Sequence, residues 1–183
     1  RDHLWSQPYN EVPIRKKCIN SIYMNILIIS VGYHARRIYL PFFIKEKGTI
    51  KEVNLVCGVD LVEQKQVIEE YLFQKDFPLP MTYIEDEVSD VVKKENEVLL
   101  HKLVQKFSID SVIIATEPLA HFKYAKWALE NDLNILMDKP ITSEIDISTS
   151  ERKAKKIVKD FLYLKKLYLK KKNAKKVSTF CLL

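Results

Sequence analysis

Short apolar runs of strand length recur along this chain, and each is followed by a longer amphipathic stretch. The clearest runs are Asn25–Ser30 (NILIIS), Val53–Val59 (VNLVCGV), Ile109–Ala115 (IDSVIIA) and Leu133–Met137 (LNILM). Continuous, branched apolar runs are typical of strands that are buried on both faces. Strands that alternate with helices form βαβ units of a parallel sheet. The pattern therefore predicts an α/β fold, a doubly wound, Rossmann-like parallel sheet with helices on both faces.

The segments between these runs have helical spacing. We expect helices over 35–47, 61–72, 87–107 and 118–131, and a Lys-rich helix over 143–172. Gly48 is expected to end the first helix, and Pro41 inside it predicts a kink or an irregular first half. Pro118 falls in a first turn, where proline is tolerated. Two weaker runs, 81–84 and 177–183, are expected to add short strands.

The chain divides into three parts. Residues 1–23 show no clear period and contain Pro8 and Pro13, so they are interpreted as an extension. Residues 24–142 form the predicted Rossmann core, and residues 143–183 complete the domain with the Lys-rich helix and a last strand. Met24 stands directly before the first strand and is one candidate start. The other alternative is that the chain, which begins with Arg1, is a piece of a longer protein.

Composition narrows the class of protein. Hydrophobic residues make up 47% of the 183, as in globular domains. No apolar run approaches the roughly 18 residues that span a bilayer. The cysteines (Cys18, Cys57 and Cys181) lack metal-ligand spacing, and His3, His34 and His101 are not grouped with such ligands, so we expect no metal site. A reducing, cytoplasmic setting is expected.

The formal charge of +6 is unevenly distributed. Residues from Glu151 onward carry a net +10, whereas residues 1–150 carry −4. In the basic segment Ile157, Phe161 and Leu164 keep near-helical spacing between lysines, which favours a helix that covers the sheet and has a solvated basic face. An anionic nucleic acid or lipid surface is the alternative partner. No nucleic-acid motif accompanies the lysines, so we expect neither nucleic acid nor membrane as a partner.

The turn after the first strand has the composition of a dinucleotide-binding loop. Such a loop reads G-x-G-x-x-G/A, in which the middle glycine admits the pyrophosphate and the last small residue lets helix pack on strand. Gly32 and Ala35 fill the second and third positions, and Ser30 stands at the first. Tyr33 and His34 lie within the turn and are candidate cofactor contacts. A tight turn without a ligand is the alternative.

Asp60 closes the second strand. A carboxylate at this point can accept hydrogen bonds from the adenosine ribose hydroxyls and would repel a 2′-phosphate. The residue therefore favours NAD over NADP. A helix N-cap is the alternative role for this aspartate.

Two further strand ends carry related motifs. After the strand at 109–115 comes Thr116-Glu117-Pro118-Leu119-Ala120-His121, and after the strand at 133–137 comes Asp138-Lys139-Pro140. The stretch from Asn25 to Thr142 resembles the N-terminal domain of the glucose–fructose oxidoreductase/inositol dehydrogenase (Gfo/Idh/MocA) family. That family shows T-P-x-x-x-H and E-K-P at these places. Here Glu117 precedes the proline, and Asp138 replaces glutamate with a shorter carboxylate.

The resemblance implies a nicotinamide cofactor lying over the sheet. Lys139 would be the catalytic residue, near the nicotinamide and the substrate, where an ammonium can stabilise alkoxide charge or donate a proton. Thr116 would line the nicotinamide side, and Glu117, Pro118 and Asp138 are further candidate cofactor contacts. His121 is also a candidate cofactor contact, and for it a packing or capping role is favoured over a catalytic one.

In the resembling family a second, C-terminal domain supplies the substrate pocket, a catalytic Asp/His pair and the oligomer interface. No residues of this chain match that pair, so we expect the chain to lack the second, substrate domain. The expected function is the NAD-binding domain of an oxidoreductase that acts on a sugar-like or polyol-like hydroxyl, a small-molecule substrate, with homo-oligomers in the full-length protein. The alternative is a non-catalytic dinucleotide-binding regulatory or interaction module.

Overall fold

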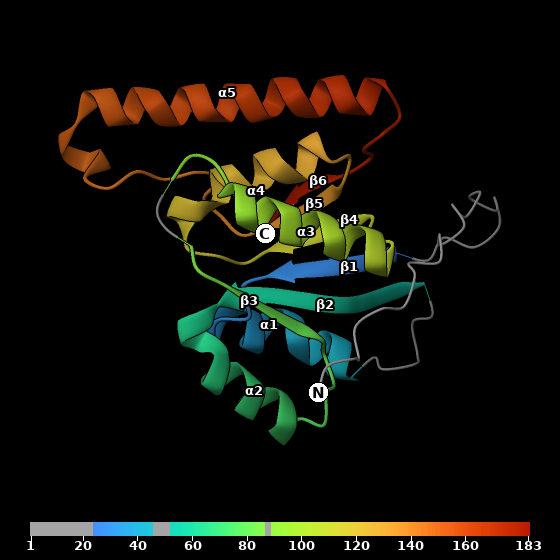
Figure 1. Cartoon of the computed structure of the whole chain (residues 1–183). Helices are drawn as coiled ribbons and strands as arrows, with labels where there is room; N and C mark the ends of the chain where they lie inside the picture. Colours follow the sequence, from blue (N-terminus) through green and yellow to red (C-terminus); the bar gives the residue numbers. More distant parts are fainter. Residues whose placement is uncertain (1–23, 46–51, 87–88) are drawn as a thin grey trace, which may run out of the picture.

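The computed structural model describes residues 24–45, 52–86 and 89–183, and it shows a parallel sheet with helices on both faces (Figure 1). The six strands of the described residues are β1 (Met24–Ile29), β2 (Val53–Leu61), β3 (Met81–Ile84), β4 (Ser111–Ile114), β5 (Asn134–Met137) and β6 (Phe180–Leu182). Their order is β3-β2-β1-β4-β5-β6, and every neighbouring pair is parallel. The predicted doubly wound α/β fold is confirmed.

Helices cover the two faces of this sheet. They are α1 (Tyr33–Lys45), α2 (Lys65–Gln74), α3 (Lys94–Phe107), α4 (Pro118–Glu130) and α5 (Glu151–Asn173), with short 3₁₀ turns η1 (Val62–Gln64) and η2 (Ile147–Thr149). Figure 1 shows α1 and α2 on one side of the sheet and α3 and α4 on the other, with α5 as an outer layer. The outer helix packs against α4.

Alternation along the strands divides the core between the two faces. In β1, Leu27 and Ile29 belong to the cluster that includes α3, α4 and α5, whereas Ile26 and Ile28 belong to the cluster that includes α1 and α2. Successive side chains of a strand point to opposite faces, which is why a strand covered on both sides is apolar throughout. Each fully buried Leu or Ile contributes about 1.5–3 kcal/mol by leaving water.

Several helix boundaries differ from the predicted ones. Helix α1 begins at Tyr33 rather than Ala35 and is continuous through Pro41, so its first half is regular. Strand β2 continues through Asp60 to Leu61, and α2 begins only at Lys65, after η1. Helix α5 begins at Glu151 rather than at residue 143, because Ser150 has an extended backbone and its side chain accepts the Lys153 N–H.

The third helix also begins late, at Lys94 rather than residue 87. The Val91 N–H donates a hydrogen bond to the Ser89 hydroxyl. Serine side chains often form such local bonds, which compete with the backbone hydrogen bonds of a helix. The predicted extension at 1–23, the Gly48 helix stop and residues 87–88 lie outside the described residues. No helix within 24–45, 52–86 and 89–183 combines the length and hydrophobicity needed to cross a bilayer.

Candidate functional site

Two adjoining cavities lie at the carboxyl ends of the strands. One, of about 500 Å³, extends over the ends of β2 and β3, and the other, of about 840 Å³, extends towards the segment after β5. They share the lining residues Ser30, Gly32, Tyr33, Thr116 and Glu117. These residues follow β1 and β4, the neighbouring strands at which the strand order reverses. Open α/β sheets bind ligands at this switch point.

The turn between β1 and α1 forms the junction of the two cavities. Ser30 has a φ of 73°, in the left-handed region that favours glycine, and its N–H donates to the Val59 carbonyl at 2.8 Å. A Cβ built on Gly32 would lie 3.4 Å from the Ser30 Oγ, an ordinary contact. A methyl group on Gly32 would thus occupy cavity space without a clash in the fold. Helix α1 begins directly after this glycine, so its N-terminus adjoins the cavities.

Asp60 supports this turn from the neighbouring strand. The residue is 6% exposed, and its carboxylate accepts hydrogen bonds from the Val31 N–H at 2.5 Å and from the Leu61 N–H at 2.7 Å. Burial raises the pKa of Asp60, and the bonds from Val31, Leu61 and the Ser30 side chain oppose that rise. The carboxylate lines the cavity and, at the same time, fixes the shape of the turn.

Asp138 ties the other cavity to α1. It accepts a hydrogen bond from the Tyr39 hydroxyl, and its Oδ1 lies 3.6 Å from Nε2 of His34. Burial, followed by the bond to Asp138, raises the pKa of Tyr39. Lys139 is exposed and lines this cavity, and its backbone N–H donates to the Leu183 carbonyl at 3.1 Å. The peptide bond from Lys139 to Pro140 is cis.

His121 lies outside both cavities and is fully buried. Its Nδ1 is 2.6 Å from the Pro140 carbonyl oxygen, and its Nε2 is 2.9 Å from the Thr116 carbonyl oxygen. The ring therefore joins the segment after β4 to the segment after β5. This is a packing role of the kind favoured for His121 from the sequence.

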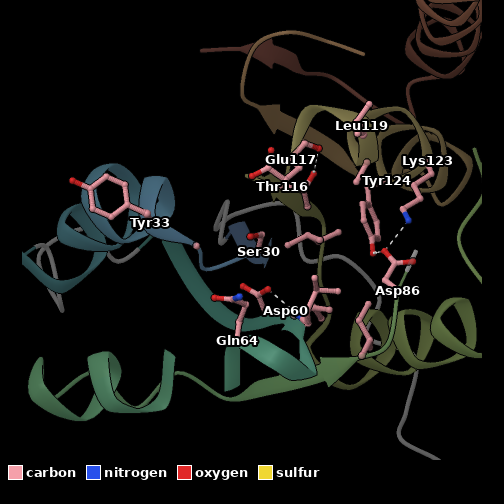
Figure 2. A pocket seen from close by; sticks show the side chains of 16 residues that line it. Ser30, Tyr33, Asp60, Gln64, Asp86, Thr116, Glu117, Leu119, Lys123 and Tyr124 are labelled. Carbon is pink, nitrogen blue, oxygen red and sulfur yellow. Dashed lines mark hydrogen bonds and ion pairs between the residues drawn. The ribbon is translucent and has the colours of Figure 1, made fainter. Parts of the chain in front are cut away.

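Three residues that the sequence motifs did not identify meet in the first cavity. Figure 2 shows Asp86, Lys123 and Tyr124 together, across the cavity from Tyr33. The Lys123 Nζ lies 2.7 Å from the Asp86 Oδ2, and the Tyr124 hydroxyl donates to the same oxygen at 2.5 Å. Burial and then this bond raise the pKa of Tyr124. The available sequence signal is a lysine within an apolar helical stretch, FKYAKWAL.

Most of the residues predicted for the site line the cavities. They are Ser30, Gly32, Tyr33, His34, Asp60, Thr116, Glu117, Pro118, Asp138 and Lys139. Ala35 and His121 do not. Ala35 lies in the first turn of α1 and is fully buried against the core, where its small side chain permits close packing of the helix on the strand.

This geometry suits an elongated ligand with an anionic centre. The helix N-terminus and the side-chain-free Gly32 lie at the middle, where backbone N–H groups can approach a diphosphate. The cavities extend from there in two directions, as two nucleoside halves require. Within the described part of the chain no group of three His, Cys, Asp or Glu side chains could hold a metal ion.

Comparisons with known proteins agree with this geometry. The family model GFO_IDH_MocA, described as an oxidoreductase family with an NAD-binding Rossmann fold, matches residues 24–160. No curated protein matches the sequence.

Similar solved structures include a Gfo/Idh/MocA family oxidoreductase from Vibrio cholerae, with 16% identity over 87% of this chain and 38% of that chain, and a TM-score of 0.57. The WlbA (WbpB) dehydrogenase from Thermus thermophilus, solved with NAD and alpha-ketoglutarate, has 18% identity over 87% of this chain and 41% of that chain, with a TM-score of 0.56. A dehydrogenase (MviM) from Clostridium difficile has 18% identity, coverage of 81% and 36%, and a TM-score of 0.51. These identities show the shared fold alone.

The chain thus spans about two fifths or less of the length of these structures. The family model, in contrast, matches well over half of this chain, and its match includes both the turn after β1 and the segment after β5. The chain therefore belongs to the Gfo/Idh/MocA oxidoreductase family and contains its NAD-binding Rossmann fold.

Proposed function

We propose that this chain binds NAD across the two cavities and is the cofactor-binding part of a dehydrogenase acting on a sugar-like or polyol-like hydroxyl. The proposal rests mainly on the position of Gly32. This glycine follows β1 at the point where the strand order reverses between β1 and β4, with α1 beginning directly after it and a cavity on either side. The adenosine half would lie over β2 and β3, and the nicotinamide half would lie towards Lys139.

In this proposal the bound cofactor supplies the hydride acceptor or donor. Lys139 contributes an exposed ammonium at the end of the second cavity, where it can donate a hydrogen bond to a substrate oxygen and stabilise developing negative charge. The hydrogen bond from its N–H to Leu183 and the link between Pro140 and His121 hold the backbone on both sides of that lysine.

The same proposal favours NAD over NADP. Asp60 lines the cavity over β2, and its carboxylate would face a phosphate on the ribose 2′-oxygen. Its bonds to Val31 and Leu61 keep it in place. Repulsion between the Asp60 carboxylate and that phosphate would weaken NADPH binding.

A reducing, cytoplasmic setting is part of the proposal and is supported by Cys57 and Cys181, which are both free thiols.

We propose no nucleic-acid or membrane partner for the basic helix. Ionic bonds with its own domain already engage Lys156, which meets Asp90, Glu144 and Asp160, and Lys171, which meets Asp132. Self-association is proposed for the full-length protein.

Titration calorimetry of the chain with NADH and NADPH tests the binding. We expect a Kd for NADH in the range of about 1 μM to 1 mM, the usual range for enzyme ligands, and weaker binding of NADPH. Absence of NADH binding below millimolar concentrations would overturn the proposal. NADPH binding equal to that of NADH would remove the preference that we assign to Asp60.

A further inference from the structure

Helix α5 carries a row of apolar side chains on the face that points away from the domain. Val158, Leu162 and Leu169, which we call the apolar row, are 57%, 54% and 45% exposed. Their spacing places them in one line along a helix. Leu167 lies two and a half turns after Val158, so it is on the opposite side, where it packs against the core. Figure 1 shows α5 as the outermost layer of the described chain, so the apolar row faces outward.

Basic side chains line one flank of this row. Arg152, Lys159 and Lys166, which we call the basic flank, are exposed and repeat every seven residues, so they form a second line beside the apolar one. None of the ion pairs formed between described residues engages these three. By contrast, Lys156 and Lys171, on the inner side of the helix, are paired with carboxylates of the domain. The charge of the basic flank is therefore available to a partner.

The outer face of α5 suits a second helix better than a lipid bilayer. Phe161 is exposed and widens the apolar face on the side away from the basic flank. Between Phe161 and the apolar row, however, stand Lys165 and Lys172, which are both exposed. Helices that lie on a bilayer keep their lysines on the polar face, so these two would have to enter the apolar layer. A facing helix can instead place a carboxylate beside each of them, as charged pairs beside a helical seam do.

The charge of α5 also selects among helices. Residues from Glu151 onward carry a net +10, so two copies of α5 would repel each other. Independently of cofactor binding, we propose that the outer face of α5 is a docking surface for an acidic amphipathic helix of another protein. Apolar residues of that helix would pack on the apolar row, and its carboxylates would lie beside the basic flank and Lys165. The apolar contacts supply affinity, and the charges supply the choice of partner.

Titration calorimetry of the whole chain with a synthetic peptide tests this proposal. The peptide has about four heptads, with leucine at positions a and d and glutamate at e and g, so its own charges oppose self-pairing. We expect one peptide to bind per chain with a Kd below ~100 μM, a modest affinity that suits a small interface. The same peptide with lysine at e and g should not bind. Raising the NaCl concentration from ~0.1 M to ~0.5 M should weaken the complex, because salt screens exposed charges.

Two pairs of variants locate the binding surface. Val158→Asp puts a negative charge into the apolar row and should weaken peptide binding at least ~10-fold, whereas Val67→Asp, at a similarly exposed valine of α2, should not. Lys159→Glu should weaken binding at least ~3-fold, and Lys102→Glu, at an exposed place on α3, is its control. Thermal unfolding checks each fold. If Val158→Asp does not fold, the lysine pair decides.

Absence of binding of the acidic peptide below ~1 mM, equal binding of the lysine peptide, or a Kd that Val158→Asp leaves unchanged would overturn the proposal. Two rival occupants are tested in parallel. Binding to phosphatidylcholine vesicles with about 30% phosphatidylserine, if Val158→Asp abolished it, would assign the face to a membrane instead. A dimer seen in sedimentation experiments, if the same variant dissolved it, would assign the face to a second copy. Either result would overturn the proposal and leave NAD binding untouched.

Discussion

At the turn after β1, a serine occupies the position at which dinucleotide-binding loops usually have glycine. A non-glycine residue in the left-handed region costs roughly 1–2 kcal/mol, and Ser30 is held there at a φ of 73°. Its side-chain bond with Asp60 and the Asp60 bond to Val31 offset that cost. The departure from the glycine motif is therefore accommodated by a partner on the adjacent strand.

Gly32→Val tests the role of this turn in binding. A valine would fill the space at the junction of the two cavities, while its Cβ would meet the Ser30 Oγ at only ordinary contact distance. We expect the Kd for NADH to rise by at least ~100-fold with the unfolding midpoint nearly unchanged, because the diphosphate could no longer approach the backbone. Unchanged affinity, measured by calorimetry, would refute the turn assignment.

Gly58→Ala is the control for that variant. Its Cβ would lie 2.6 Å from the Met81 Sδ, within the sheet and away from the cavities. The methionine is flexible and sits on the edge strand β3, so we expect a loss of about 1 kcal/mol in the free energy of unfolding. NADH affinity should stay the same. The two glycines thus separate a binding defect from a packing defect.

Asp60→Asn separates the two roles of that carboxylate. The amide oxygen can still accept the Val31 N–H, but the bond from the Leu61 N–H is lost, so we expect the fold to be kept with a loss of about 1 kcal/mol in the free energy of unfolding, while the negative charge is removed. We expect NADPH binding to approach NADH binding in parallel calorimetric titrations. Asp60→Ala would also leave the buried N–H of Val31 unpaired and should cost about 1–3 kcal/mol in unfolding experiments. If the asparagine variant kept the full preference for NADH, Asp60 would be a support of the turn alone.

Between elements, His121 is the link that connects the ends of β4 and β5. His121→Leu would remove both contacts of the buried ring, with the carbonyl oxygens of Thr116 and Pro140, at a partly buried place. We expect a loss of about 2–3 kcal/mol in the free energy of urea unfolding, because a carbonyl oxygen that loses its hydrogen-bond donor away from water costs on the order of 1–3 kcal/mol. His101→Leu is the control: its ring has one bond, to Asn131, at a half-buried place, so a loss of about 1 kcal/mol is expected. Similar losses in both variants would contradict this role.

The C-terminal half of α5 is held to the α4–β5 turn by charge. Partial burial would raise the pKa of Asp132, but bonds from Lys171 and Lys176 outweigh this and lower it. A lowered pKa in the folded state stabilises the fold above the ordinary value of 3.8, and this stabilisation is lost as the pH falls through the lowered value.

Asp132→Asn tests that dependence, since asparagine also tolerates the left-handed backbone of Asp132. Thermal unfolding should show the unchanged chain to be the more stable at neutral pH. The difference should persist down to about pH 4 and shrink below it. A difference that stayed constant at lower pH would show that the ion pairs are not its source.

The elements themselves were largely predictable, because strands buried on both faces leave a strong apolar signal. The residues at which the helices begin were harder to predict. Local bonds decide where α3 and α5 begin, and the hydroxyls of Ser89 and Ser150 take part in them. Apolar spacing is insensitive to such bonds, since it continues into the turn that precedes each helix.

Over the whole molecule, residues after separate strands converge at one edge of the sheet. The motifs at Gly32, Asp60, Thr116 and Lys139 predicted this convergence, because parallel strands end on the same side. The ion pair between Asp86 and Lys123 was not predictable in this way. Asp86 lies in no motif, and the burial of Lys123 depends on how α4 meets the segment after β3, where Asp86 lies.

Amide hydrogen exchange with and without NADH tests most directly that a dinucleotide lies across this edge. The account predicts slower exchange on cofactor addition in residues 30–37, 59–64 and 115–123, which line the two cavities or adjoin them. Exchange in the outer part of α5 should not change. Protection that is missing from the turn at residues 30–37, or that falls mainly on α5, would contradict the account.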